Sequence, residues 1–203
     1  KFIDDILKKL LSLHNIVMLG LHKLGAVAIP ATHLLTEKDL IYRCNAANVK
    51  AIVAAAEPVI LTHVEGCLEQ SPSVKWLIAT DNYEEGRWYS MYKGRRNAPE
   101  FVRPEHVNTN NALSLLYSSS GSSGNPKMVA HNFLYPLGHI VTAKYWQKVE
   151  ENKLHLTMSD SGWAKFAWGK IYGQWICGAT VVAYNNEKFS AANTLKLIEE
   201  IKL

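Results

Sequence analysis

Cysteine is scarce in this sequence, and its spacing excludes two common uses of the residue. The three cysteines, Cys44, Cys67 and Cys177, are odd in number and far apart, and none belongs to a C-x-x-C pair. A disulfide framework uses an even set of cysteines, and a structural zinc site uses clustered ones. The pattern therefore indicates a reducing compartment, and the predicted location is the cytoplasm.

Long apolar runs and strongly one-sided charge are also absent. No uninterrupted apolar run reaches the roughly 20 residues of a membrane span, and no signal-peptide pattern opens the chain. The formal net charge is only +4, and the basic residues are dispersed. A nucleic-acid-binding protein usually carries a basic stripe or patch. We therefore predict neither a membrane span nor a nucleic-acid partner, whereas the oligomeric state is left open.

Three familiar catalytic patterns are missing as well. The eight histidines include no H-E-x-x-H motif and no pair four residues apart, and no serine lies in a G-x-S-x-G elbow. The sequence also lacks the G-x-x-x-x-G-K-[ST] pattern of Walker-type nucleotidases. A dedicated metal site, a covalent serine mechanism and a Walker nucleotidase are therefore all disfavoured.

What the chain does contain is an alternation of helical and strand-like segments. With 48% hydrophobic and 20% charged residues, it is typical of a globular protein. Apolar spacing predicts helices over 2–24, 36–47, 57–69, 135–147, 163–175 and 191–201, and strands over 26–29, 49–54, 74–79, 154–157 and 179–184. Such alternation predicts an α/β fold rich in parallel sheet and flanked by helices. Residues 81–111 lack the pattern and are predicted to form an irregular surface excursion.

Helix-capping residues fix several of these boundaries. Thr36 is followed three residues later by Asp39, which predicts a reciprocal N-cap pair, and Ser190 is predicted to cap the last helix. Asp160 is predicted to be an N-cap by the same reasoning. Trp168 and Trp175 are seven residues apart, which predicts that both lie on the core-facing side of one helix.

The most informative segment is a loop rich in hydroxyl groups and glycine, residues 117–127, which follows the apolar run Leu113–Tyr117. Gly121 and Gly124 allow backbone conformations with positive φ, five serines supply hydroxyl donors, and Lys127 supplies a positive charge. Ser/Gly clusters are often flexible linkers. Here the cluster joins two apolar segments directly and ends in Pro126-Lys127, which favours a phosphate-binding loop over a linker.

The residues Ser119–Lys127 resemble the [ST]-S-G-[TS]-[TS]-G-x-P-K signature of adenylate-forming enzymes. Two further segments resemble the same superfamily. Leu156–Lys165, with Trp168 and the Gly-Ala pair ending at Ala179 behind it, is similar to the S-D-T-G-W region of medium-chain and related bacterial acyl-CoA synthetases, and Leu21–Thr32 is similar to a helix-to-strand passage near the front of the domain. The resemblance spans residues 21 to 179 in the expected order.

This resemblance implies a fold, a reaction and a set of ligands. The chain would be part of the large N-terminal domain of an acyl-CoA synthetase, residues 1–203, with the C-terminal domain absent. The implied reaction joins a small-molecule carboxylate to ATP, with Mg²⁺ carried by the nucleotide, and then to the co-substrate CoA. The residues implied to bind the ATP phosphates are Ser119, Ser120, Gly121, Ser122, Ser123, Gly124 and Lys127.

Parts of the family pattern have no counterpart within these residues. The blocks that bind adenine, ribose and magnesium, and the domain that carries the catalytic lysine, are not found before Leu203. We therefore predict that the 203-residue chain alone is inactive and contains no complete catalytic set. The alternative hypothesis is a non-catalytic remnant or interaction module that keeps the α/β scaffold.

Two other side chains, Trp163 and His131, could serve either a binding or a structural role. Trp163 matches the tryptophan of the S-D-T-G-W region, which implies a place along the passage for the acyl chain or the pantetheine arm of CoA; packing in the core is the other reading. His131, four residues after Lys127, lies near enough to order the loop, but a plain structural histidine is the favoured prediction.

Overall fold

The computed structural model describes residues 11–105, 109–119, 125–184 and 189–203, and the chain forms two compact units. Unit 1 comprises residues 1–30 and 103–203, and unit 2 comprises residues 31–102. Each unit has a hydrophobic cluster of its own. The predicted mixture of helices and largely parallel strands is confirmed.

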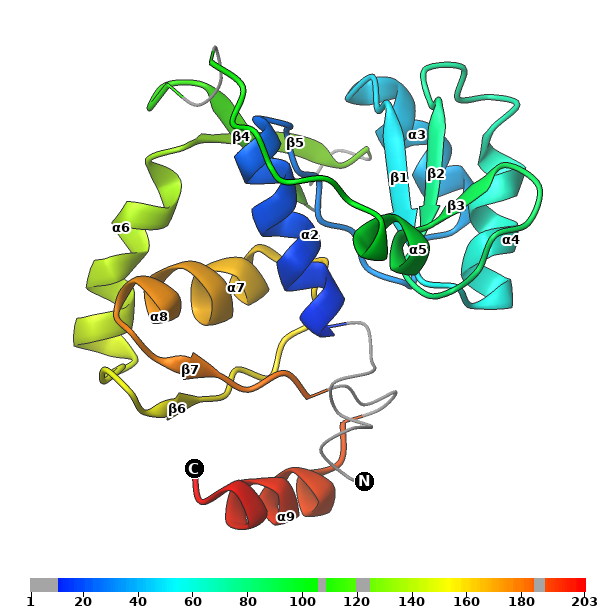
Figure 1. Ribbon diagram of the computed structural model, residues 1–203. Coiled ribbons are helices and arrows are strands. Elements are labelled where there is room, and N and C mark those ends of the chain that lie inside the picture. Colours follow the sequence, from blue (N-terminus) through cyan, green and yellow to red (C-terminus); the bar gives the residue numbers. More distant parts are fainter. Residues whose placement is uncertain (1–10, 106–108, 120–124, 185–188) are drawn as a thin grey trace. The chain divides into compact units, whose positions relative to one another are not determined.

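Unit 2 is a small parallel sheet packed against two helices (Figure 1). Its elements are α3 (Glu37–Ala46), β1 (Ala51–Ala54), α4 (Pro58–Cys67), β2 (Trp76–Ala79), β3 (Trp88–Ser90) and α5 (Met91–Arg96). The strands are parallel in the order β1-β2-β3. Helix α3 begins as predicted, because the Thr36 side chain accepts the Asp39 backbone N–H and Asp39 accepts the Thr36 backbone N–H in return.

The predicted surface excursion over 81–111 is wrong in its middle, because residues 88–96 form β3 and α5. Trp88 is buried in the core of unit 2, and its indole N–H donates to Glu65 Oε1 at 2.8 Å. A three-residue strand is too short to show an alternating pattern in the sequence. Its pairing with β2 and the burial of one tryptophan hold it in the sheet.

Unit 1 combines a hairpin, a short parallel pair of strands and several helices (Figure 1). Its elements are α2 (Leu11–Leu24), β4 (Leu113–Ser119), β5 (Lys127–Asn132), α6 (Tyr135–Val141), η1 (Thr142–Trp146), β6 (Leu154–His155), α7 (Ala164–Phe166), η2 (Ala167–Ile171), α8 (Tyr172–Ile176), β7 (Thr180–Val181) and α9 (Ala191–Ile201). The predicted strand over 26–29 is reduced to a parallel bridge between Ala28 and Leu115. The Ser190 side chain caps α9 as predicted, by accepting the Asn193 backbone N–H.

Two of the predicted helices contain a wider, π-helical turn that the sequence did not reveal. These turns are η1, after α6, and η2, between α7 and α8. A π turn uses hydrogen bonds from residue i+5 to residue i, and such turns occur frequently at functional sites. A single π turn changes the apolar spacing of a helix too little to be recognised from the sequence.

The helices α6 and α8 approach each other closely at Gly173. A methyl group on Gly173 would collide with the backbone carbonyl of His139 and would lie 2.8 Å from Ala143 Cβ. Only glycine therefore permits this distance between the helices.

We expect Gly173→Ala to lower the free energy of unfolding by about 1–3 kcal/mol, because overpacking a fixed helix contact forces the backbone to shift. Gly138→Ala is the matched control, since a methyl group there meets nothing within 4 Å. That variant should be slightly stabilised by the higher helix propensity of alanine. Urea denaturation of both variants measures the difference, and equal stability of the two would contradict this packing model.

Candidate functional site

The hairpin β4–β5 brings the two ends of the predicted phosphate loop together. The strands β4 and β5 lie side by side (Figure 1). They are antiparallel, and their last paired residues are Ser119 and Lys127. The Ser119 hydroxyl donates to the Lys127 carbonyl oxygen at 3.4 Å. Ser119, which carries a hydroxyl donor, and Lys127, which carries an ammonium group, are therefore directly paired at the two ends of the segment 120–126.

Lys127 is exposed, and no carboxylate in the described ranges forms an ion pair with it. With respect to the described residues, its ammonium group can bind an anion without first breaking a salt bridge. The predicted phosphate-binding residues Ser120, Gly121, Ser122, Ser123 and Gly124 lie outside the described residues. Their part in the loop stays a prediction.

Aromatic rings pack together beside the middle of the hairpin. Tyr117 is buried, and the His131 ring lies 5.7 Å from it and 4.1 Å from the ring of Tyr135, centroid to centroid. Burial raises the pKa of Tyr117 and lowers that of His131, so both side chains are neutral near pH 7. This packing supports the structural reading of His131.

The second motif forms a tight turn in front of α7. Asp160 Oδ1 accepts the Gly162 backbone N–H at 2.8 Å, and the Trp163 backbone N–H donates to the Asp160 carbonyl at 3.2 Å. The predicted N-cap role of Asp160 is wrong, because Trp163 occupies the N-cap position and makes no side-chain cap bond. Asp160 instead stabilises the turn that precedes the helix.

Trp163 does not pack in the core. Its side chain is 66% exposed, which excludes the core reading and leaves a large aromatic surface at the end of the turn. The prediction that Trp168 and Trp175 share a core-facing side is also wrong, since Trp175 is 36% exposed. Trp168 lies within η2 and Trp175 lies in α8 after it, so the wider turn interrupts the 3.6-residue period that would place both on one face. The ring of Trp168 stacks on that of His139, with 6.2 Å between the ring centroids.

A buried lysine in η2 was not anticipated from the sequence. Lys170 is 1% exposed, and its ammonium group lies 5.2 Å from the centre of the Phe166 ring. Burial lowers its pKa to about 8. His14 is partly buried, and this burial lowers its pKa to about 4, although Asp160 acts in the opposite direction. No periodicity signal could have found Lys170, because the π turn places it inside.

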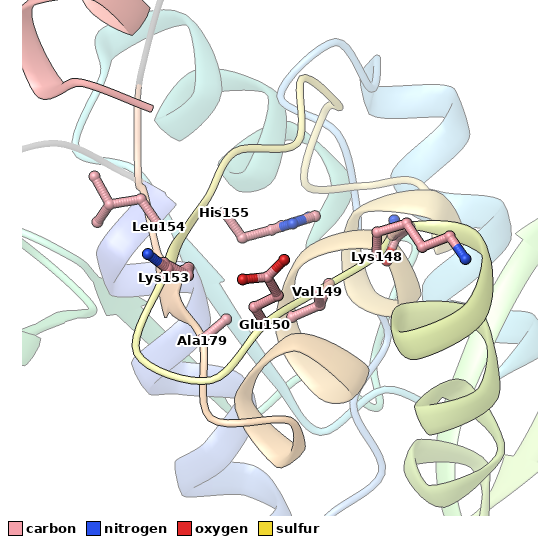
Figure 2. Close-up of a pocket in the computed structure, with 8 residues that line it drawn as sticks. Lys148, Val149, Glu150, Lys153, Leu154, His155 and Ala179 are labelled. Carbon is pink, nitrogen blue, oxygen red and sulfur yellow. The ribbon is translucent and has the colours of Figure 1, made fainter.

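A pocket of about 310 Å³ lies where η1 leads into β6 (Figure 2). It is lined by Gln147, Lys148, Val149, Glu150, Lys153, Leu154, His155 and Ala179. None of these residues was predicted to bind a ligand. Within the described ranges, no cluster of three or more His, Cys, Asp or Glu side chains could hold a metal ion.

Among the described residues, no helix combines the length and the apolar character needed to cross a bilayer.

Comparison with known proteins identifies the family. The family model for AMP-binding enzymes matches residues 13–203. The human protein "Acyl-coenzyme A synthetase ACSM3, mitochondrial" is 29% identical over 181 residues, which are 87% of this chain and 30% of that protein. The 4-hydroxybutyrate–CoA ligase 1 of Metallosphaera sedula is 35% identical over 184 residues, 90% of this chain and 30% of that protein.

The fold agrees with this assignment. A crystal structure of the anthranilate CoA ligase AuaEII in complex with anthranoyl-AMP superposes with a TM-score of 0.81 at 20% identity, over 91% of this chain and 35% of that one. The chain spans about 30% of the length of the curated relatives that it matches. Because the family model covers nearly all of these residues, the chain belongs to the AMP-binding enzyme family.

Proposed function

We propose that the chain supplies the phosphate-binding part of an acyl-CoA synthetase. In the proposed reaction a carboxylate attacks the α-phosphorus of ATP, the acyl-adenylate forms and pyrophosphate leaves. The thiol of CoA then attacks the acyl carbon, the thioester forms and AMP leaves. Membership of the AMP-binding family and similarity to CoA ligases support this proposal.

The observation that carries the proposal is the pairing of Ser119 with Lys127 at the loop end of the hairpin. As the α-phosphorus is attacked, negative charge accumulates on the departing pyrophosphate. Lys127 and the Ser119 hydroxyl would hold its oxygens, which is preorganised electrostatic stabilisation of a leaving group. Ser120, Gly121, Ser122, Ser123 and Gly124 would complete the cradle with hydroxyl and backbone N–H donors.

The proposed ligands follow from this donor set. Lys127 carries no lone pair for a metal, and residues 117–127 contain no carboxylate, the ligand that usually binds Mg²⁺ in proteins. We therefore propose that Mg²⁺ arrives bound to ATP. The exposed indole of Trp163 would line the passage for the acyl chain or for the pantetheine arm of CoA. We further propose a cytoplasmic location, which rests on the three free cysteines, although several relatives carry "mitochondrial" in their names.

Exchange of labelled pyrophosphate into ATP tests the proposal. The full-length gene product is incubated with Mg-ATP, labelled pyrophosphate and a panel of aliphatic and aryl carboxylates. We expect exchange that requires a carboxylate, because only the reversal of adenylate formation returns the label to ATP. The 203-residue chain, assayed in parallel, should show none. Absence of exchange by the full-length protein with every carboxylate would contradict the proposal and favour the non-catalytic module.

A further inference from the structure

The carbonyl oxygen of Gly169, in the η2 turn, is a meeting point for side chains from two other segments. The Thr157 hydroxyl donates to it, and the Nε2 atom of His155 lies 3.1 Å from it. Gln147 at the end of η1 donates its Nε2–H to the same oxygen over 3.4 Å. His155 Nε2 also lies 2.9 Å from the Thr157 hydroxyl, so the three groups form one connected network.

This network closes a loop of chain that contains the exposed tryptophan. Thr157 precedes the turn Asp160–Gly162, and Gly169 follows Trp163 by six residues. At its centre the loop is held by the bond from the Gly162 N–H to Asp160 Oδ1. At its base it is held by the bond between Thr157 and Gly169. The position of Trp163 therefore depends on a contact that is distant from it in sequence.

Two glutamine side chains also hold η2, the turn that contains Gly169. Gln174 is fully buried, and its amide N–H donates to Gln147 Oε1 and, at 3.4 Å, to the Trp168 carbonyl. The turn η2 is thus tied to η1 through two glutamine side chains. Thr157 also approaches Gly169 closely, since its Cγ2 atom would lie 3.4 Å from a methyl group built on that glycine. A turn held in this way offers a rigid support for the segment in front of it.

We infer that Thr157 is a positioning residue for Trp163. Through the Gly169 carbonyl it holds the turn in the conformation that presents the indole to the organic substrate. This inference rests on the proposed function, in which Trp163 lines the passage for the acyl chain or the pantetheine arm. Thr157 itself is not proposed to touch a substrate, and its effect is transmitted by the geometry of the segment 157–169.

The kinetic test compares four variants of the full-length gene product. Trp163→Ala identifies which KM, for the carboxylate or for CoA, depends on the indole. Thr157→Val is nearly isosteric and removes the hydroxyl, so it should raise that same KM by about three- to tenfold while the KM for ATP stays unchanged. Thr157→Ser keeps the hydroxyl and should stay close to wild type. Thr180→Val, on the exposed side of β7, is the matched control for a threonine-to-valine change.

A second readout needs no activity. In the ¹⁵N spectrum of the full-length gene product, with the indole resonance assigned by Trp163→Phe, the indole N–H resonance of Trp163 should shift in Thr157→Val and stay in place in Thr157→Ser and Thr180→Val. A Trp163 resonance that is unmoved by Thr157→Val would overturn the inference. So would an unchanged KM in Thr157→Val when Trp163→Ala raises that KM. If Trp163→Ala raises neither KM, the passage role is what has failed, and the spectrum alone decides whether Thr157 positions the indole.

Discussion

Replacing Lys127 by alanine is expected to slow adenylate formation by about ten- to a hundredfold in the full-length gene product. Lys127 lies at the loop end of the β4–β5 hairpin, paired with Ser119, and has no ion-pair partner among the described residues. One charge-assisted bond to a phosphate is worth on the order of 1.5–3 kcal/mol, which gives that factor if it is fully expressed in the transition state. The thioester step from supplied acyl-adenylate should change little, because pyrophosphate has already left.

The two half-reactions therefore separate a catalytic loss from a structural one. Rapid-quench measurement of acyl-adenylate formation and of acyl-CoA formation from added adenylate gives both rates. Lys144→Ala is the control, since Lys144 is an exposed lysine of the same unit that lies on η1 and away from the hairpin. An equal loss in both half-reactions of Lys127→Ala would show that the lysine maintains structure and does not stabilise the departing pyrophosphate.

A second large effect is expected at Lys170, because its charged form is buried in η2. Its pKa falls from 10.5 to about 8 through burial, so the folded state favours the neutral amine. A lowered pKa of this size corresponds to about 3 kcal/mol of destabilisation wherever the amine is charged in both states. The free energy of unfolding should thus be reduced below pH 8 and should recover as the pH rises from about 8 towards 10.5.

We expect Lys170→Met to raise the free energy of unfolding at pH 7 by about 2 kcal/mol and to remove the rise between pH 8 and 10.5. The neighbouring groups that affect this region titrate elsewhere, since the pKa of His14 is lowered to about 4 and that of His155 is also lowered by burial. Lys165→Met, at an exposed position of the preceding helix, should leave the pH profile unchanged. Urea denaturation from pH 7 to 10.5 measures both variants. A wild-type stability that does not rise over this range would contradict the assignment of a lowered pKa to Lys170.

The regular part of the fold could be predicted from the sequence because its signals are local. The reciprocal Thr36–Asp39 cap and the Ser190 cap set helix starts within three residues of chain, and both are present. The alternation of helix and strand predicted the parallel sheet of unit 2. What could not be predicted depends on contacts between distant segments: the short strand β3 exists through its pairing with β2, and Trp88 is buried by the elements packed around it.

In the candidate site, too, the local motif could be predicted, whereas features that depend on distant contacts could not. The motif of residues 119–127 predicts that Ser119 and Lys127 bind phosphate, which stays a prediction, and the hairpin pairs these two residues directly. The π turns could not be predicted from a 3.6-residue period. For that reason the exposure of Trp175 and the burial of Lys170 were not predicted either. Thr157 was missed as well, since its partner Gly169 lies 12 residues away and only the folded turn brings them together.

In the proposed reaction the β4–β5 hairpin holds the phosphates of ATP. Amide hydrogen exchange of the full-length gene product, with and without Mg-ATP, followed in the peptides that cover residues 113–132, tests it most directly. We predict slower exchange between Ser118 and Lys127 when Mg-ATP is bound, little change in the flanking strands, and a weaker effect in Lys127→Ala at the same nucleotide concentration. Unchanged exchange in this segment at a nucleotide concentration that saturates the protein would show that the phosphates bind elsewhere.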